Sequence, residues 1–322
     1  MSPDTSSSPS VSPTLAAIVV TMNRPQHLRE TLSRLRAEKA DFIVVVDNGS
    51  DAETRSWLAQ QADETTHIIL SEHNLGGAGG FALGMQAAIE TFSPDWLVVM
   101  DDDARPFAGA FDQFRQHLDA QWDAIAAAVT YPDGEICEMN RPLLNPFRSL
   151  PAFLQSIRGF RLSDTAYAPD APPRQVQMTS FVGFFVSAKA IARIGYPDPR
   201  LFLYGDDQLY ALRLSRAGLR IGFLPAIRFE HDCATFETGL RIYKPVWKAY
   251  YNYRNGILVY RGAAGLLAPV LLALRLPRWF AAARHYGEEA PTYRRLLRRA
   301  ILDGLLNRLD RLPEGVPGPG QD

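Results

Sequence analysis

Apolar runs of strand length alternate with helical patterns over the first 130 residues. The expected strands are 15–22, 42–47, 67–70, 95–100 and 124–130, and the expected helices between them are 24–38, 54–61, 79–92 and 107–118. The strands lack regular polar alternation, which indicates that both of their faces are buried. The pattern therefore predicts an α/β fold in which a parallel sheet is covered by helices on both sides.

The alternation changes after Tyr131. Proline-rich loops follow, elements resume over 176–195, and a helix from about Asp207 ends at Gly218. From Trp247 onward the pattern is helical. The predicted organisation is a disordered tail over 1–13, the α/β domain over 14–245, a basic helical region over 246–312 and a flexible tail over 313–322.

Charge is distributed unevenly along the chain. The net charge of −1 predicts no nucleic-acid partner, yet the segment from Arg241 to Arg311 has 14 basic and 4 acidic residues, a balance of 14 − 4 = +10. The two cysteines, Cys137 and Cys233, can build neither a disulfide framework nor a CxxC metal site. The Ser/Pro-rich N-terminus does not resemble a signal peptide. We therefore expect a reducing, cytoplasmic location.

Two C-terminal segments bear on membranes. The longest near-apolar run, GAAGLLAPVLLAL, covers only 262–274, which is too short to span a bilayer. The segment 293–309 predicts a helix with arginines on one side. Its apolar face consists of Tyr293, Leu296, Leu297, Ala300, Ile301 and Leu305. This helix either packs on the rest of the fold or makes peripheral contact with anionic lipid at the inner face of the cytoplasmic membrane.

Acidic side chains follow three of the expected elements. Asp47 follows FIVVV, Asp101–Asp103 follow WLVVM, and Asp206–Asp207 follow FLYG. Ligands of an open α/β sheet bind at the carboxyl ends of its strands. A turn or helix cap explains Asp47 taken alone, and capping is also an alternative for Asp207. Three consecutive carboxylates repel one another, so Asp101–Asp103 predict a divalent-cation site.

The stretch NLGGAGGFALG (74–84) allows a competing hypothesis. Gly77, Gly79 and Ala82 match the G-x-G-x-x-A pattern of dinucleotide-binding folds, with Asp101 at a suitable distance. However, the pattern follows the third strand rather than the first, and a single ribose-binding acid would suffice. We expect these glycines either to let the backbone approach a ligand or to pack a helix start tightly.

Five segments together resemble family 2 glycosyltransferases of the GT-A fold. These are VVVDNGS, NLGGAGGFALGM, MDDDARP, FLYGDDQLYALRLSRAG and WKAYYNYRN. The resemblance covers residues 15–255 and is strongest to bacterial galactofuranosyltransferases, with rhamnosyltransferases next. It implies a Rossmann-like, mostly parallel sheet flanked by helices, with a helical C-terminal extension.

The resemblance also implies roles for individual residues. Asp101 and Asp103 would hold a donor diphosphate through Mg²⁺ or Mn²⁺, and His231 would complete the metal shell. Asp207 would be the catalytic base, with Asp206 beside it. The chain departs from the family pattern at Glu230, where an aromatic residue often precedes the histidine. The implied donor contacts are Thr21, Arg24, Asp47, Asn74, Gly76, Gly77, Gly79, Gly80 and Asp102.

We therefore expect a metal-dependent, inverting glycosyltransferase of cell-surface polysaccharide synthesis. It would transfer galactofuranose from UDP-galactofuranose to a hydroxyl of a glycan or lipid-linked acceptor; a dTDP-rhamnose-dependent rhamnosyltransferase is the alternative. A nucleotidyltransferase would require a basic, glycine-rich loop where this chain has TMNRPQ (21–26). Asp207 beside the metal motif argues against a non-catalytic sugar-binding module.

Overall fold

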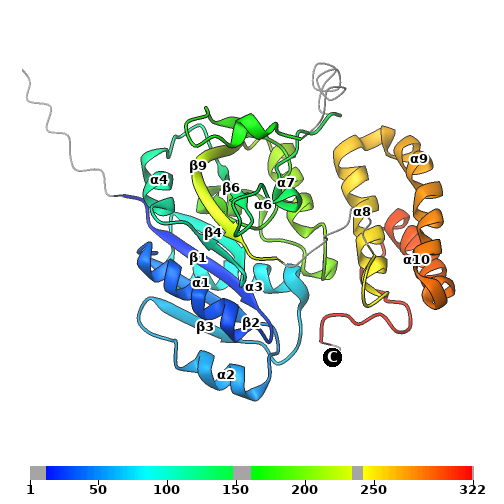
Figure 1. The fold of residues 1–322 in the computed structure, drawn as a ribbon, viewed down its shortest axis with the longest axis horizontal. Helices are drawn as coiled ribbons and strands as arrows, with labels where there is room; N and C mark the ends of the chain where they lie inside the picture. The colour runs from blue at the N-terminus through cyan, green and yellow to red at the C-terminus, as the bar shows by residue number, and fades with distance from the viewer. Residues whose placement is uncertain (1–11, 148–160, 234–241, 321–322) are drawn as a thin grey trace, which may run out of the picture.

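The computed structural model describes residues 12–147, 161–233 and 242–320. Residues 1–11 of the expected disordered tail, Arg241 of the basic segment, and the last two residues of the chain lie outside the described residues. Within that part, the chain forms one nine-stranded sheet with helices on both faces, and a helical region lies beside it (Figure 1). The expected α/β architecture is confirmed.

The sheet is mixed rather than wholly parallel. Its strands run in the order β3-β2-β1-β4-β8-β6-β9-β5, with β7 paired to β9. The strands are β1 (Leu15–Thr21), β2 (Phe42–Asp47), β3 (Thr66–Leu70), β4 (Trp96–Asp101), β5 (Ala104–Pro106), β6 (Ala124–Thr130), β7 (Arg174–Val176), β8 (Phe184–Ser187) and β9 (Ile221–His231). The first four long strands are parallel, as predicted, and β6 is parallel to β9. Antiparallel β8 lies between β4 and β6 and so joins the two parallel groups.

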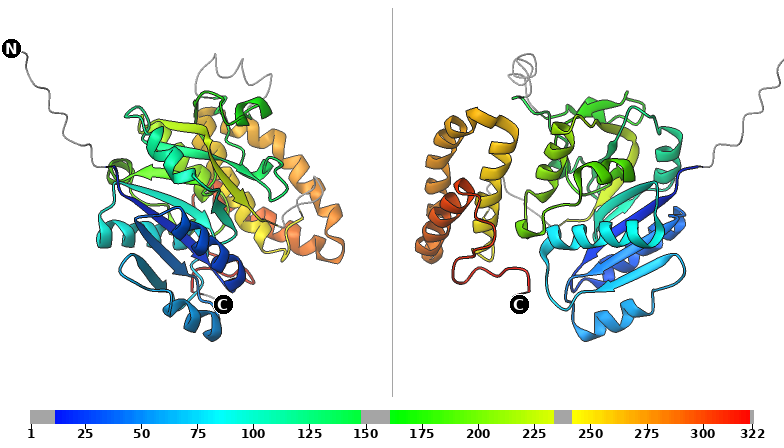
Figure 2. Two further views of the ribbon diagram at one scale, coloured as in Figure 1. Left: turned by 60° about the vertical axis from the view of Figure 1, so that its left-hand side comes forward. Right: turned by 180° about the vertical axis from the view of Figure 1, so that it is seen from behind.

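The helices divide between the two faces of the sheet. The helices of the α/β region are α1 (Pro25–Ala37), α2 (Ala52–Ala59), α3 (Gly76–Phe92), α4 (Ala110–Gln116), α6 (Ala188–Ile194) and α7 (Asp206–Arg216). Short 3₁₀ turns are η1 (Glu138–Asn140), η2 (Asp164–Tyr167) and η3 (Pro199–Leu201). Helix α1 covers one face and α3 the other (Figure 2).

Alternating side chains of β1 explain why both faces are covered. Ile18 and Val20 pack with α3, α6 and α7, whereas Ala17 and Val19 pack with α1 and α4. All four side chains are buried. Since successive side chains of a strand point to opposite faces, an uninterrupted apolar run is stable only between two layers of helices.

The helical region has a core of its own. It contains α8 (Lys248–Ala264), η4 (Gly265–Leu267), α9 (Ala268–Ala281), η5 (Ala282–His285), η6 (Gly287–Glu289) and α10 (Ala290–Leu305). Tyr250, Tyr251 and Tyr253 of α8 pack there with Tyr293 of α10, so the aromatic side chains of the segment WKAYYNYRN (247–255) belong mainly to this core. Most of the apolar face expected on 293–309 is therefore buried, and packing on the rest of the fold is its structural role.

One run of helices in the described part of the chain, Lys248–His285, is long and apolar enough to cross a membrane by length and composition. Its 18-residue window has a mean hydropathy of 1.9, and 28% of that window is buried. The run is not one straight helix, because the chain turns at Gly265, where φ is 55°, and α9 returns beside α8 (Figure 1).

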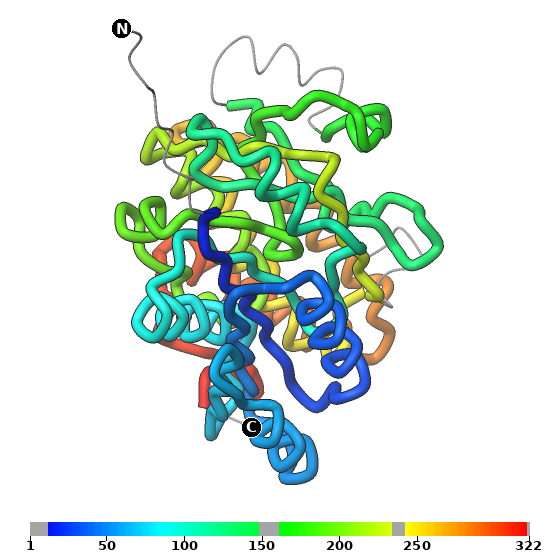
Figure 3. Tube along the Cα trace, turned by 90° about the vertical axis from the view of Figure 1, so that its left-hand side faces the viewer, coloured from blue at the N-terminus to red at the C-terminus, as the bar shows by residue number. Residues whose placement is uncertain are grey.

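The C-terminal segment differs from the flexible tail that the sequence predicts. Residues 313–320 run from the helical region back to the sheet region (Figure 3). Val316 is buried, and the Tyr251 hydroxyl donates a 2.6 Å hydrogen bond to the carbonyl of Pro317. The amide of Gly320 donates to the carbonyl of Asn74 at 3.1 Å. These contacts hold the segment against the loop that precedes α3.

Candidate active site

Asp101, Asp103 and His231 meet where β4 and β9 end. Their ligand atoms all lie within 4.8 Å of one another, and Nε2 of His231 is 3.2 Å from Oδ1 of Asp103. The pairing of β5 with β9 sets this arrangement, because Ala104 is in register with His231. Sequence reasoning identified the three residues, and the fold brings them together.

The electrostatics of this cluster depend on burial and on one another. Loss of hydration raises the pKa of Asp101 to about 7. Burial also opposes ionisation of Asp103, but hydrogen bonds from His231 and Arg24 outweigh it and lower the pKa of Asp103 to about 2. Burial opposes protonation of His231, yet Asp103 and Asp101 raise its pKa to about 10. The carboxyl groups of Asp101 and Asp103 therefore place negative charge beside the imidazole ring of His231.

Asp102 points away from this cluster. Its carboxylate accepts hydrogen bonds from the Thr21 hydroxyl at 2.7 Å and from Arg24 at 2.8 Å. Arg24 also donates to Asp103 at 2.8 Å. Burial raises the pKa of Asp102 to about 6 despite the cation of Arg24. Asp102 thus fixes β1 and the start of α1 to the cluster, which explains three consecutive aspartates where a metal site needs two.

Glu230 has a separate task. Strand alternation turns it away from the side of β9 that carries His231. It forms a 3.0 Å ion pair with Arg105, which is buried and also pairs with Glu30 and Asp232. At the position where the chain departs from the family pattern, Glu230 therefore compensates a buried arginine, and the cluster of Asp101, Asp103 and His231 is unaffected.

Two hollows adjoin at the cluster. The larger, of about 700 Å³, extends along the ends of β1 and β4 and the start of α3; the smaller, of about 310 Å³, extends toward α7 and α8. Asp101 and His231 line both. The larger hollow is also lined by Thr21, Arg24, Asn48, Asn74, Gly76, Gly77, Asp102 and Asp103. The smaller is also lined by Asn140, Ser180, Tyr204, Asp206, Asp207, Gln208 and Asn252.

The glycines before and within α3 divide into two kinds. A side chain on Gly77 would meet no atom within 4 Å, so its bare backbone faces the hollows. Gly76 has φ +68°, and a Cβ there would lie 2.1 Å from the carbonyl oxygen of Phe202. In contrast, Gly79 faces Leu75, and Gly80 faces β1. Gly79 and Gly80, two of the implied donor contacts, line neither hollow, and they allow close packing of α3.

Asp47, another of the implied donor contacts, lines neither hollow. Its side chain is fully buried, and both carboxylate oxygens accept from the amide of Ser50 at 3.2–3.3 Å. Arg55 lies 3.7 Å away. Asp47 thus shapes the turn after β2, and its neighbour Asn48 lines the larger hollow instead.

The segment that leads into α7 has an unusual backbone. Phe202, Tyr204 and Gly205 have φ values of 62°, 66° and 76°. A non-glycine residue in the left-handed region costs about 1–3 kcal/mol, and such strain is common at functional sites. The turn brings Asp206 and Asp207 to the start of α7, where the helix dipole favours negative charge.

Burial sets the charge state of this acidic pair. Loss of hydration and the adjacent Asp206 raise the pKa of Asp207. Burial also raises the pKa of Asp206. Oδ1 of Asp207 accepts from the amide of Gln208 at 2.7 Å. Asp207 therefore sits at the wall of the smaller hollow as a carboxyl group with increased proton affinity.

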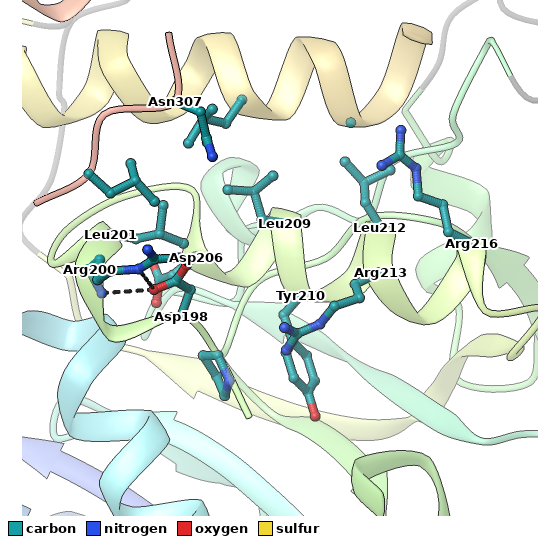
Figure 4. A pocket seen from close by; sticks show the side chains of 14 residues that line it. Asp198, Arg200, Leu201, Asp206, Leu209, Tyr210, Leu212, Arg213, Arg216 and Asn307 are labelled. Atoms are coloured by element: carbon teal, nitrogen blue, oxygen red, sulfur yellow. Dashed lines mark hydrogen bonds and ion pairs between the residues drawn. The ribbon is translucent and has the colours of Figure 1, made fainter. Parts of the chain in front are cut away.

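Figure 4 shows a third hollow, between α7 and α8, with Asp206 in its wall. The Asp198–Arg200 ion pair, at 2.7 Å, lies at one end of it. Asp206 borders both this hollow and the smaller active-site hollow, whereas Asp207 borders only the latter. Of the two acids, Asp207 is thus the one confined to the space shared with Asp101.

Sequence reasoning missed several residues beside the cluster. Oδ1 of Asn140 lies 2.7 Å from Nδ1 of His231, and Cys137 lies 4.0 Å from the same nitrogen. These residues are more than ninety positions from His231 along the chain. The parallel pairing of β6 with β9 brings them together, and no sequence signal reports that pairing.

The residues of the cluster fit a divalent cation. Two carboxylates and one imidazole offer three ligands to a cation, and all three residues line the larger hollow, from which further ligands could come. Oxygen and nitrogen donors of this kind suit Mg²⁺ or Mn²⁺. The pKa of Asp101 also supports cation binding. Burial and the neighbouring carboxylates raise this pKa, and a bound cation would offset both effects.

The family model and the relatives together identify the chain as a glycosyltransferase. The chain belongs to glycosyl transferase family 2, whose family model matches residues 16–176. It is 29% identical over 262 residues to the galactofuranosyltransferase GlfT1 of Mycolicibacterium smegmatis, covering 75% of this chain and 81% of the relative. The GlfT1 of Mycobacterium tuberculosis is 31% identical over 259 residues, covering 74% and 79%.

Other relatives are more distant. The N-acetylglucosaminyl-diphospho-decaprenol L-rhamnosyltransferase of M. tuberculosis is 26% identical, covering 68% of this chain and 76% of the relative. Among solved structures, the mannosyltransferase PcManGT of Pyrobaculum calidifontis, in complex with GDP-Man and Mn²⁺, has a TM-score of 0.52 at 14% identity, covering 93% and 89%. This likeness confirms the GT-A fold.

Proposed function

We propose that the protein is an inverting, metal-dependent galactofuranosyltransferase that uses UDP-galactofuranose. The observation that carries the proposal is the meeting of two hollows at Asp101 and His231, with Asp207 in the wall of the smaller one only. The larger hollow would bind the nucleotide sugar and the smaller one the acceptor. This division separates the leaving diphosphate from the base that activates the acceptor.

The chemical step assigned to Asp207 is proton transfer. An acceptor hydroxyl is a weak nucleophile until a carboxylate takes its proton. The hydroxyl oxygen then forms the new bond to the anomeric carbon while the bond to the diphosphate breaks on the opposite side. Attack from the side of Asp207 inverts the anomeric configuration.

Asp101, Asp103 and His231 would hold Mg²⁺ or Mn²⁺ beside the diphosphate. When bound, the cation supplies positive charge for the leaving group. The backbone at Gly77 and the side chains of Asn48 and Asn74 border the same hollow, and these groups would position the nucleotide. Arg24 forms ion pairs with Asp102 and Asp103, each at 2.8 Å, and would thereby orient the cluster.

The choice of donor rests on the GlfT1 relatives, whose names specify galactofuranose. The rhamnosyltransferase relative supports dTDP-rhamnose as a second candidate. In both cases the acceptor would be a hydroxyl of a glycan or a lipid-linked saccharide. Family membership removes the nucleotidyltransferase alternative.

A donor panel tests this proposal. The full chain is supplied with Mn²⁺, a galactofuranosyl acceptor and, in turn, UDP-galactofuranose, UDP-galactopyranose, dTDP-rhamnose or GDP-mannose, and both nucleotide release and the linkage of the product are measured. We expect transfer from UDP-galactofuranose with inversion, and transfer that is slower by about 10²–10⁴-fold in Asp207→Asn. Transfer from dTDP-rhamnose alone, or a retained anomeric configuration, would overturn the proposal.

We also propose a cytoplasmic protein that contacts the inner face of the cytoplasmic membrane. Leu266 is 99% exposed and Leu274 is 68% exposed, and both lie on the turn and helix that follow α8. Between Ile242 and Gly287 the sequence has no Asp/Glu and, besides the buried Arg254, six Lys/Arg. Exposed leucines on a basic surface suit an anionic lipid surface, where a lipid-linked acceptor would be found.

A further inference from the structure

Three sulfur atoms gather beside His231. The thiols of Cys137 and Cys233 lie 4.0 Å apart, and the Cys233 thiol lies 3.4 Å from the Met139 thioether. The Cys137 thiol is also 4.0 Å from Nδ1 of His231. The ligand atoms of the two cysteines and the histidine all lie within 4.8 Å of one another.

The spacing of these atoms is that of a metal-binding set. Around a tetrahedral ion with metal–sulfur bonds of about 2.3 Å, neighbouring sulfur atoms lie about 3.8 Å apart. The observed sulfur–sulfur distances of 3.4 and 4.0 Å fall on either side of that value. Thiolate, thioether and imidazole ligands select soft cations, unlike the carboxylates of Asp101 and Asp103.

We propose that Cys137, Met139, Cys233 and Nδ1 of His231 form a second cation site, for a thiol-seeking cation of the Zn²⁺ or Cu⁺ class. The set has access to solvent, because Met139 and Cys233 line the larger hollow and are partly exposed, although Cys137 is buried. Two thiolates would balance the charge of a divalent ion.

His231 belongs to both cation sites. Its Nε2 faces Asp103 at 3.2 Å, and its Nδ1 faces Asn140 at 2.7 Å and Cys137 at 4.0 Å. A neutral imidazole has one free lone pair, so it serves one cation at a time. With Nδ1–H donated to Asn140, the lone pair on Nε2 faces the carboxylates; with the soft cation on Nδ1, it does not.

The two sites are therefore antagonistic. A soft cation at the sulfur atoms withdraws His231 from Asp101 and Asp103 and weakens Mg²⁺ or Mn²⁺ binding there. This antagonism rests on the proposed catalytic cation site, whereas the sulfur site itself does not.

The test uses the reduced, metal-free full chain without oxygen. Co²⁺, a spectroscopic substitute for Zn²⁺, is titrated in, and Zn²⁺ is then used to displace it. We expect tetrahedral Co²⁺ absorption with sulfur-to-cobalt charge transfer, and about tenfold or greater loss of affinity in Cys233→Ser. Met139→Leu is expected to weaken binding less, and Met22→Leu, at a methionine of similar exposure, is the matched control.

Because Cys137 is buried, Cys137→Ser is interpreted only if its circular dichroism is native; the partly exposed Cys233 keeps the test decisive. Absence of charge transfer in the wild type, or the same spectrum in Cys233→Ser, would overturn the sulfur site. An Asp101→Asn variant that keeps the charge transfer would show that the sulfur site does not require the carboxylate of Asp101.

Antagonism is measured by Mn²⁺ electron paramagnetic resonance rather than by activity. One equivalent of Zn²⁺ is expected to lower Mn²⁺ affinity about tenfold or more in the wild type and to have no such effect in the Cys137→Ser/Cys233→Ser double variant. Zn²⁺ bound at the cysteines with unchanged Mn²⁺ affinity would contradict the sharing of His231. Failure of Mn²⁺ to bind at all would contradict the proposed catalytic cation site and leave the cobalt result valid.

Discussion

The side-chain amide of Asn255, in the middle of α8, donates a 2.8 Å hydrogen bond to the carbonyl of Tyr204, two residues before Asp206. The same amide donates to the carbonyls of Leu201 and Leu203 at 3.0 and 2.9 Å. The helical region thereby holds the strained turn that presents the acidic pair.

Replacing Asn255 with Leu tests this support. The change removes the amide that donates to the carbonyls of Leu201, Leu203 and Tyr204, so we expect the free energy of unfolding to fall by about 1–3 kcal/mol and kcat to fall with it. Gly256→Ala, on the next residue, is the control, because a Cβ there meets no atom within 4 Å. Urea unfolding of both variants decides the matter, and equal stability would contradict the role of Asn255.

Asp207→Asn keeps the size of the side chain but removes the base. We expect transfer to fall by about 10²–10⁴-fold with donor affinity largely retained, since general-base catalysis contributes that much. Steady-state kinetics and donor calorimetry measure the two quantities. Asp206→Asn is the matched comparison, and a larger rate loss there than in Asp207→Asn would reverse the assignment within the pair.

Metal removal should abolish transfer. After dialysis against EDTA we expect no product, and we expect added Mg²⁺ or Mn²⁺ to restore it, because Asp101 and Asp103 cannot hold a diphosphate by themselves. Asp103→Asn should weaken Mn²⁺ binding, as read by electron paramagnetic resonance. Full turnover in excess chelator, with no metal detected in the protein, would refute the requirement.

Mn²⁺ affinity should increase with pH. A cation needs His231 neutral and Asp101 ionised, and their pKa values are raised to about 10 and about 7. Protons compete with the cation below each value, so binding strengthens as pH rises through the pKa of Asp101 and towards that of His231. Calorimetry in buffers of different ionisation enthalpy should record proton release, and binding without proton release would contradict this electrostatic account.

Vesicle flotation tests the lipid surface. We expect Leu266→Gln/Leu274→Gln to bind anionic vesicles more weakly than the wild type does, because both leucines are exposed on the basic region. Leu70→Gln, at a 38% exposed leucine on β3, should bind as the wild type does.

The arginines of α10 are expected to make a separate, salt-dependent contribution to vesicle binding. Arg294, Arg295 and Arg298 are exposed, whereas Arg299 pairs with Asp303 at 2.7 Å. Changing the three exposed arginines to Gln should reduce binding at low salt by about 1 kcal/mol each and leave transfer to a soluble acceptor unchanged. If wild type and variant float to the same extent at low salt, the arginines of α10 do not contribute to lipid binding, and the helix has only its packing role.

The local pattern of apolar and polar residues was enough to predict the parallel strands β1–β4 of the sheet. The runs at β1, β2 and β4 are apolar on both faces, and each is followed by a helix or turn signal. Antiparallel β8 could not be predicted in the same way. It has only four residues, and its neighbours β4 and β6 lie more than fifty residues away along the chain.

The site shows the same limit. Asp101, Asp103 and Asp207 stand beside recognisable elements, so their types and positions are informative. Asn140 carries no such signal, because its importance depends on the distance to His231, which only the strand order determines. At Asp47, the sequence pattern favoured a turn and the family resemblance favoured a donor contact; in the structure its buried carboxylate accepts from the amide of Ser50 in the turn after β2.

Arg254 has a consequence for engineering acceptor specificity. Its buried guanidinium donates to the carbonyls of Arg200 and Leu201, so part of the wall of the catalytic domain is built on α8. A chimera that exchanges everything after residue 246 between relatives would replace those donors without replacing the loop they support. Successful grafts will therefore need to carry residues 200–205 together with the helices, as one transplantable unit.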